Sequence, residues 1–238
     1  MTANPLEDDL DVEETPTIVT DVAANTALSP ELTSSVLAAA TAAEDTAARP
    51  GTCVVLRIAG ARGGRRFDWP GPVGVGDVTK WEAALRRLEQ APAPIVALVD
   101  GDAYGPAAEL LLVADYRIMG AGASFSFAAS EAGVWPAMAL HRLAAQVGIG
   151  RVRELAVQGR PLSAEAARAC AVIDAVAEHG AEAAAIAAGR ALFRSCVGSE
   201  IAIRRRLVLD AVTTRFEDAL GAHLAASDRT LRRVRAVS

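Results

Sequence analysis

The chain has 238 residues, a net charge of −5 at pH 7, and a composition of 52% hydrophobic and 22% charged residues. These proportions are ordinary for a globular protein, and the acidic balance argues against nucleic-acid binding, which normally needs a basic domain or stripe. The cysteines (Cys53, Cys170 and Cys196) have the spacing of neither a metal site nor a disulfide framework, so we expect a reduced protein without a metal centre.

The amino-terminal segment is acidic. Residues 1–15 read as a disordered tail and lack the apolar run of a signal peptide. No part of the chain reaches the roughly 18 consecutive apolar residues expected of a membrane helix. We therefore expect a cytoplasmic protein that binds neither membrane nor nucleic acid.

Along the rest of the chain, apolar runs that suit buried strands alternate with helical patterns. Ser29 followed by Pro30 marks a helix start, because serine caps a helix and proline suits its first position. Asp77 is expected to cap a second helix. The predicted strands are 17–22, 53–58, 94–99, 116–119, 124–127 and 171–176, and the predicted helices are 30–48, 78–88, 106–114, 138–147, 151–158, 163–170, 181–196 and 199–237.

This order predicts an α/β fold with parallel strands, followed by a helical carboxyl-terminal region. The last helix carries apolar residues at helical spacing, which either close the core or pack on a second subunit: Ile201, Leu207, Leu220 and Leu224. The basic groups at 204–206 and 229–235 are expected to be solvated helix faces, with contact to an anionic ligand or partner as the alternative.

The segment from Pro94 to Pro161 carries the candidate chemistry. A buried strand leads through a glycine-bearing turn into a helix, and the free amides at a helix start can hold an anion or a developing oxyanion. Glu109 lies one turn into this helix, in the otherwise apolar run 107–114. Because a buried glutamate needs compensation, Glu109 either pairs with an arginine or lines a pocket, where burial would raise its pKa.

At these residues the chain resembles the enoyl-CoA hydratase/isomerase (crotonase) superfamily. The run Asp100-Gly101-Asp102-Ala103-Tyr104-Gly105-Pro106-Ala107-Ala108-Glu109-Leu110 aligns without a gap on the family's Asn-Gly-x-Ala-x-Gly-Gly-Gly-x-Glu-Leu. Residues 115–118, 159–167 and 172–174 resemble further family motifs. The resemblance implies a crotonase (ClpP-like) β-β-α spiral core over 16–180, a helical trimerisation region over 181–238, and a homotrimer or hexamer.

Members of this superfamily bind an acyl-CoA thioester, and two backbone amides hold its oxygen while an enolate forms. The resemblance implies that Glu109 is the catalytic acid/base and favours the pocket over the arginine pair. It also implies that coenzyme A enters as the substrate thioester, with no separate cofactor. Asp115 and Arg117 are expected to be structural polar groups.

The chain departs from the family pattern at the second oxyanion donor. Pro106 occupies the position whose amide normally donates, and proline has no N–H. Proline is also simply well suited to the first position of a helix. If the site works, the amide of Gly105 or of Ala107 must replace the missing donor.

A second departure concerns the other family glutamate. That residue lies twenty positions after the first, which is Ala129 here, and Glu131 can substitute only if the backbone shifts. In the family's double-bond isomerases this glutamate shuttles the proton, so its replacement argues against isomerase activity.

The first oxyanion loop also differs in sequence and length. Placing Phe67 on the family's phenylalanine makes the amide of Trp69 the first donor. Three arginines of this loop, Arg62, Arg65 and Arg66, either meet the phosphates of coenzyme A or form a solvated basic loop, and the solvated loop is the favoured alternative.

Residues 79–89 and 135–143 resemble a narrower subgroup, the hydratase-like proteins that accompany a type III polyketide synthase in making 3,5-dihydroxyphenylacetyl-CoA, an antibiotic precursor. This implies a crotonase-fold lyase of secondary metabolism acting on an enoyl-CoA or polyketide-CoA. The alternative is a catalytically impaired auxiliary subunit that binds a polyketide synthase or a catalytic crotonase paralogue. A plain acyl-CoA-binding module is a third hypothesis.

Overall fold

The computed structural model describes residues 17–46, 49–64, 66–131 and 133–237. The predicted acidic tail and Arg65 lie outside the described residues. Within them, five parallel strands form the main sheet in the order β1-β2-β3-β5-β10. Their bounds are Thr17–Ala23 for β1, Cys53–Ala59 for β2, Ile95–Asp100 for β3, Tyr116–Gly120 for β5 and Ala175–Ala177 for β10.

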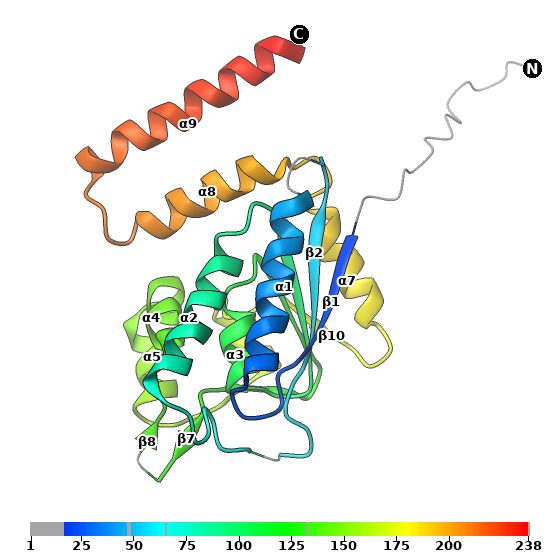
Figure 1. Cartoon of the computed structure of the whole chain (residues 1–238), viewed down its shortest axis with the longest axis vertical. Coiled ribbons are helices and arrows are strands. Elements are labelled where there is room, and N and C mark those ends of the chain that lie inside the picture. Colours follow the sequence, from blue (N-terminus) through cyan, green and yellow to red (C-terminus); the bar gives the residue numbers. More distant parts are fainter. Residues whose placement is uncertain (1–16, 47–48, 65, 132, 238) are drawn as a thin grey trace, which may run out of the picture.

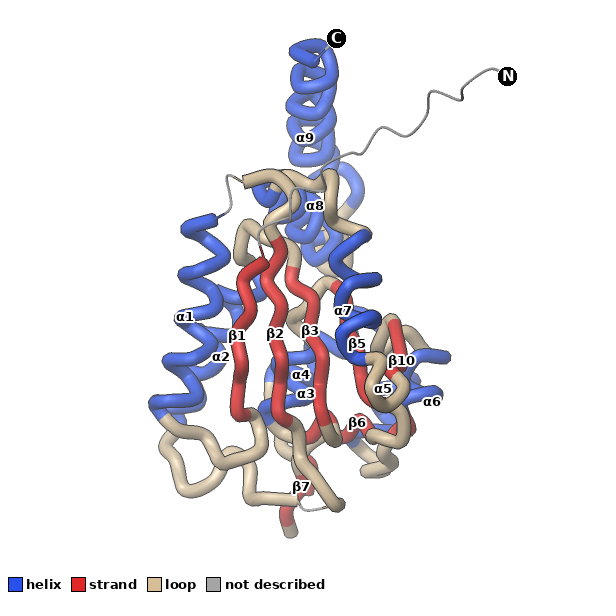
Figure 2. Tube along the Cα trace, turned by 90° about the vertical axis from the view of Figure 1, so that its right-hand side faces the viewer, coloured by secondary structure: helices blue, strands red, loops and turns tan. Residues whose placement is uncertain are grey.

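Helices cover both faces of this sheet, which explains the continuous apolar character of β2 and β3. On one face lie α1 (Pro30–Thr46), α2 (Val75–Glu89) and α3 (Pro106–Leu111), and on the other lies α7 (Glu182–Ala191). Figure 2 shows the sheet between α1 and α7. Alternate strand residues therefore enter different hydrophobic clusters: Ala97 and Val99 face α3, whereas Val96 and Leu98 face α7. The predicted parallel α/β fold is confirmed.

The remaining strands are very short. One small sheet joins β4 (Ala103–Tyr104), β6 (Ser124–Ser126) and β9 (Leu162–Ser163). An antiparallel hairpin joins β7 (Ala129–Ser130) to β8 (Gly133–Val134). The sequence analysis did not predict this hairpin, because two-residue strands are too short to show a periodic pattern.

Of the two helix caps predicted from the sequence, one is confirmed and the other was wrong. The start of α1 is confirmed, since Oγ of Ser29 accepts from the amide of Leu32 at 3.2 Å. The prediction that Asp77 caps α2 was wrong: the helix begins at Val75, and Asp77 lies in its first turn. There its carboxylate accepts from the amide of the capping residue Gly74 at 3.3 Å, because an acidic side chain one turn in can reach back to the cap.

The middle of the chain follows the prediction more closely. The bounds are Met138–Val147 for α4, Ile149–Ala156 for α5 and Ala164–Ala169 for α6. Helix α3 ends at Leu111 and not near Ala114, because residues 113 and 114 bond back only three positions, in a tight turn that leads into β5.

The predicted single helix over 199–237 was wrong. The structure has two helices, α8 (Gly198–Asp210) and α9 (Phe216–Val237), which fold back as a hairpin beyond the end of the sheet (Figure 1). The carbonyl of Asp210 accepts from the amides of Thr213 and Thr214, at 3.1 and 2.9 Å, and so closes a turn. Threonine is a poor helix former, which favours a break here.

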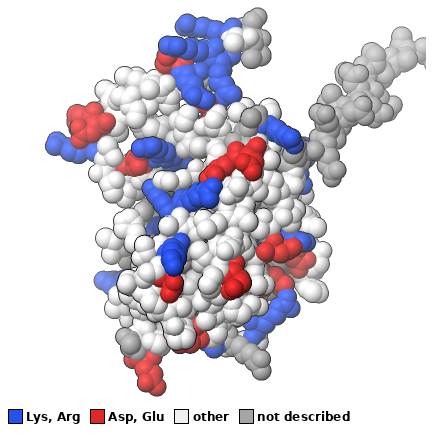
Figure 3. Space-filling model, in the orientation of Figure 1, with Lys and Arg blue, Asp and Glu red and all other residues white. Residues whose placement is uncertain are grey.

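In the described ranges, no helix is both long and apolar enough to cross a membrane. On the face shown in Figure 3, acidic and basic side chains are interspersed.

Candidate active site

The turn between β3 and α3 places the candidate chemistry. Gly105 precedes the helix with a φ of 56°, in the region that favours glycine. A Cβ added at Gly105 would lie 3.1 Å from Cγ of Trp69, so the indole ring packs directly on the start of α3. Pro106 takes the first helical position, as predicted. The strand, glycine turn and helix expected from the sequence are therefore present.

Glu109 lies one turn into α3 and is held by two indoles. Nε1 of Trp69 donates to its Oε1 at 2.9 Å, and Nε1 of Trp81 donates to its Oε2 at 2.6 Å. The residue is only 3% exposed. Neither alternative from the sequence describes this arrangement: among the described residues no arginine contacts the carboxylate directly, and the carboxylate is covered instead of facing an open pocket. We call Glu109, Trp69 and Trp81 the indole clamp.

The two tryptophans come from different parts of the fold. Trp81 belongs to α2 and is 1% exposed, whereas Trp69 belongs to the β2–α2 loop and is 5% exposed. Their rings meet edge to face, with centroids 5.6 Å apart. The sequence analysis named Trp69 only for its backbone amide and gave Trp81 no role. The sequence could have suggested the pairing, because buried indole N–H groups need acceptors and a buried glutamate needs donors.

The surroundings of Glu109 raise its pKa toward neutral pH. Burial raises its pKa to about 7, while the bonds from Trp81 and Trp69 act in the lowering direction. The negative charge of Glu82 raises the pKa further, and the positive charge of Arg142 lowers it. A carboxyl group with a pKa near the working pH can both accept and donate a proton efficiently.

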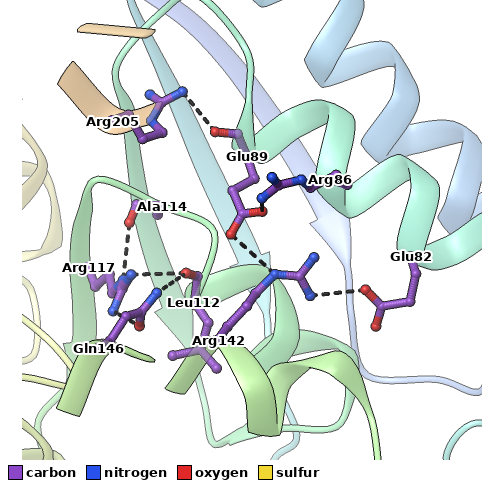
Figure 4. A network of polar contacts seen from close by, with 9 residues as sticks. All are labelled: Glu82, Arg86, Glu89, Leu112, Ala114, Arg117, Arg142, Gln146 and Arg205. Carbon is purple, nitrogen blue, oxygen red and sulfur yellow. Dashed lines mark hydrogen bonds and ion pairs between the residues drawn. The ribbon is translucent and has the colours of Figure 1, made fainter. Parts of the chain in front are cut away.

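A largely buried ionic network joins α4 to α2 (Figure 4). Arg142 of α4 is 9% exposed and donates to Glu82 at 3.0 Å and to Glu89 at 3.2 Å. Arg86 completes the network, with 2.7 Å to the other oxygen of Glu89. Arg142 therefore links α4 to two acidic residues of α2, next to the indole that holds Glu109. The sequence analysis did not find this network.

A second polar group in Figure 4 joins the carboxyl-terminal region to the core. Arg205 of α8, whose side chain is 9% exposed, donates to Asp115 and to the carbonyls of residues 89, 91 and 93. The prediction of a solvated face was wrong for this residue, because these acceptors require a buried guanidinium. Arg117 donates to the carbonyls of Leu112 and Ala114, which fits the structural role expected for Asp115 and Arg117.

The oxyanion positions remain predictions. Pro106 offers no N–H, and Ala107 is fully buried in the first turn of α3. The backbone on either side of Trp69 is anchored: the hydroxyl of Tyr104 donates to the carbonyl of Phe67 at 3.2 Å, and the amide of Leu28 donates to the carbonyl of Pro70 at 3.0 Å. The ring of Trp69 covers the space in front of Gly105.

The other predicted residues lie on exposed elements. Ala129 is in β7, and Glu131 lies between β7 and β8, at the lower end of the molecule in Figure 1. Arg62 forms an ion pair with Asp100, and the guanidinium of Arg66 stands 5.5 Å from the centroid of the Tyr104 ring. Both arginines are exposed, and their contact with coenzyme A stays a prediction.

Comparisons with known proteins agree with this fold. The enoyl-CoA hydratase/isomerase family model matches residues 78–236. An enoyl-CoA-hydratase of Amycolatopsis orientalis is 39% identical over 165 residues, which cover 69% of this chain and 75% of that protein. The methylmalonyl-CoA decarboxylase of Escherichia coli is 28% identical over 112 residues, which cover 45% of this chain and 43% of the relative.

Solved structures show the same fold at lower identity. An enoyl-CoA hydratase from a Polaromonas species superposes with a TM-score of 0.76 at 21% identity, covering 92% of this chain and 89% of that one. An enoyl-CoA hydratase/isomerase from Marinobacter aquaeolei gives a TM-score of 0.73 at 19% identity, covering 94% and 89%. The family model, the Amycolatopsis relative and the fold agree: this chain belongs to the enoyl-CoA hydratase/isomerase family, as a hydratase-like member.

Proposed function

We propose that this protein is a hydratase- or dehydratase-like lyase that acts on an acyl-CoA thioester, with Glu109 as its proton carrier. One observation carries the proposal. Glu109 is a buried carboxyl group whose pKa is raised to about 7 by burial, in the helix that follows a glycine turn. It aligns with the first catalytic glutamate of the family, and burial excludes competing water.

One carboxyl group is sufficient for a balanced dehydration. Glu109 takes the α-proton of a 3-hydroxyacyl thioester, and negative charge builds up on the thioester oxygen. The amide of Trp69 and that of Gly105 or Ala107 hold this oxygen, which is where donors contribute most to the rate. The protonated Glu109 then gives its proton to the departing hydroxyl group, which leaves as water. Hydration is the same sequence in reverse.

The substrate class follows from the subgroup resemblance of residues 79–89 and 135–143. We propose a polyketide-CoA of secondary metabolism, such as an intermediate of 3,5-dihydroxyphenylacetyl-CoA formation, and a cytoplasmic location. Coenzyme A is then part of the substrate, and no separate cofactor takes part. Arg62 and Arg66, two exposed arginines of the β2–α2 loop, are the proposed contacts for its phosphates.

The carboxyl-terminal hairpin supports an oligomer. Five apolar residues of α9 are at least 45% exposed: Phe216, Leu220, Leu224, Leu231 and Val234. At about 100° per residue their directions fall within one helical stripe. An apolar stripe of this kind normally packs on a partner. We propose a homotrimer or hexamer in which this stripe lies between subunits.

A second candidate function is an auxiliary subunit of a polyketide synthase or of a catalytic crotonase paralogue. Three observations favour it: Pro106 removes one donor, Ala129 replaces the second carboxylate, and the indole clamp occupies both oxygens of Glu109. Loss of one oxyanion donor typically costs about 100- to 1,000-fold in rate, and loss of one acid/base group about 100- to 10,000-fold.

The test uses purified protein with crotonyl-CoA and 3-hydroxybutyryl-CoA in heavy water, followed by mass spectrometry. We expect hydration, dehydration or α-deuterium uptake by the wild type, and loss of all three in Glu109→Gln. Glu165→Gln, at an exposed glutamate of α6, is the matched control and should behave as the wild type. Turnover that survives Glu109→Gln contradicts the proposed role.

Absence of turnover and of exchange in the wild type favours the auxiliary subunit. The discriminating measurement is then co-purification with a type III polyketide synthase, and stimulation of that synthase by the wild type and by Glu109→Gln alike. Binding of coenzyme A thioesters with neither turnover nor stimulation corresponds to a plain binding module.

A further inference from the structure

The two indole donors of the clamp differ in how firmly the fold holds them. Both indoles lie in the main hydrophobic cluster, but Trp81 belongs to a helix and is 1% exposed, against 5% for Trp69. Trp69 belongs to a loop and covers Gly105, the residue that begins α3. The two indoles hold different oxygens of the same carboxylate. One oxygen can therefore be released while the other stays bound.

We propose that Trp81 is a positioning residue that holds Oε2 of Glu109 throughout the reaction, and that the ring of Trp69 swings away when the thioester enters, so that Oε1 carries the proton. The inference rests on the proposed function, since it assigns the atoms of the same site.

Space at the start of α3 decides which indole moves. In the proposed function the thioester oxygen lies beside the amide of Gly105 or Ala107, and Trp69 packs on Gly105 so closely that an added Cβ would lie 3.1 Å from its ring. The ring and the thioester therefore compete for one position. Because the carbonyls of Phe67 and Pro70 are both hydrogen-bonded, the ring can rotate while the Trp69 amide stays in place as a donor.

Trp81 is not free to move in the same way. It is among the largest fully buried side chains of the protein and packs within α2 against the core. Rotating it would open a cavity the size of an indole, and cavities of that kind are strongly destabilising. Its hydrogen bond to Glu109 is also the shorter of the two, 2.6 Å against 2.9 Å.

The chemistry of indole supports the assignment of oxygens. An indole N–H only donates, so it favours the ionised carboxylate and keeps a lone pair of Oε2 occupied. Once Trp69 has left, Oε1 is the oxygen without an N–H donor and so the one that takes the proton. The charges of Arg142 and Glu82 also shift the pKa of Glu109, and rotation of the Trp69 ring does not move either charge.

Three single substitutions separate these roles: Trp81→Phe, Trp69→Phe and Trp135→Phe. Trp135 is the matched control, a partly buried tryptophan outside the clamp. For Trp81→Phe we expect kcat to fall about 10- to 100-fold with little change in KM. The pH at which kcat rises should move upward, because the lost bond had lowered the pKa of Glu109. Trp69→Phe should change KM and leave the pH dependence of kcat in place, since Trp69 is already displaced in the complex.

Two kinetic results would overturn the assignment. An unchanged kcat and pH profile in Trp81→Phe would show that this indole does not position the carboxylate. A Trp69→Phe variant that copies the kcat loss and pH shift of Trp81→Phe would show that both donors act in the complex. Absence of turnover in the wild type, in contrast, overturns the proposed function itself, and is thereby distinguished from failure of this inference.

Fluorescence tests the motion without turnover. In Trp81→Phe/Trp135→Phe only Trp69 emits, and crotonyl-CoA should shift its emission to longer wavelength as the ring becomes exposed. In Trp69→Phe/Trp135→Phe only Trp81 emits, and crotonyl-CoA should leave it unchanged. The emission of Trp81 should also titrate near pH 7 and lose that titration when Glu109→Gln is added. A shift of Trp81 and not of Trp69, or a titration that survives Glu109→Gln, overturns the proposal.

Discussion

Arg205 donates to both carboxylate oxygens of Asp115, a residue ninety positions earlier in the chain. The same guanidinium donates to the carbonyls of residues 89, 91 and 93, just before β3. Asp115 in turn accepts from the amide of Ile95, at 2.8 Å. One side chain of α8 thus joins the carboxyl-terminal hairpin to the amino-terminal ends of β3 and β5.

We predict that Arg205→Ala is strongly destabilising. It removes the guanidinium that pairs with the Asp115 carboxylate and donates to three carbonyls, and breaking a buried pair in this way costs about 3–5 kcal/mol. Arg206→Ala, at the neighbouring arginine with an 82% exposed side chain, should cost little. The two free energies of unfolding, measured by urea denaturation, check the prediction, and equal values for the two variants would contradict it.

The pH dependence of stability should report on Glu109. Its pKa is about 7 in the folded protein against an ordinary 4.5, so the folded state binds the proton more tightly between these values. Stability from this group is then gained as pH falls through 7 and lost as pH rises, by about 3 kcal/mol in all. Glu109→Gln has no carboxyl group to titrate at this position. As pH rises from 5 to 8, the wild type should therefore lose stability relative to Glu109→Gln.

The measurement is urea unfolding of both proteins at several pH values across this window. The difference between them cancels the titration of all other groups. A difference that does not change between pH 5 and pH 8 would contradict a buried Glu109 with a raised pKa.

Arg142 should matter for both stability and pH dependence. Arg142→Met leaves Glu82 and Glu89 partly or fully buried without their shared cation, which costs about 3–5 kcal/mol. Because Arg142 lowers the pKa of Glu109, the pH at which activity rises should also move upward. Adding Glu89→Gln should recover part of the stability, as measured by thermal unfolding. A double variant less stable than Arg142→Met would contradict the assigned pairing.

Pro106→Ala restores an N–H at the first position of α3. If the chain works with a weakened oxyanion site, kcat should rise, by up to the 100- to 1,000-fold that one donor typically contributes. The loss of a favourable first-position proline should cost little stability. Hydration of crotonyl-CoA measures the effect, and an unchanged kcat would indicate that the amide of Gly105 or Ala107 already holds the oxyanion.

The apolar stripe of α9 should set the oligomeric state. Leu220→Ser/Leu224→Ser removes two side chains from its centre, which are 45% and 59% exposed in the single chain. We expect a shift from trimer or hexamer toward monomer in sedimentation analysis. Arg232→Ser, at a residue of α9 with a 77% exposed side chain, is the control. A monomeric wild type would contradict the proposed contact.

The sequence by itself determined the parallel α/β core, most strand and helix positions before residue 198, the glycine turn and the position of Glu109. These features depend on local patterns: apolar runs, caps, and a motif of about a dozen consecutive residues. The comparisons placed the chain in the family that this motif had suggested.

Only the tertiary structure decided what surrounds Glu109. Trp81 and Trp69 lie 28 and 40 positions away in the chain, and Arg205 lies 90 positions from Asp115. Such contacts depend on which helices the order of the strands brings together, and no local pattern encodes that order. The break between α8 and α9 and the β7–β8 hairpin were missed for a different reason: a short turn and strands of two residues give no clear periodic pattern.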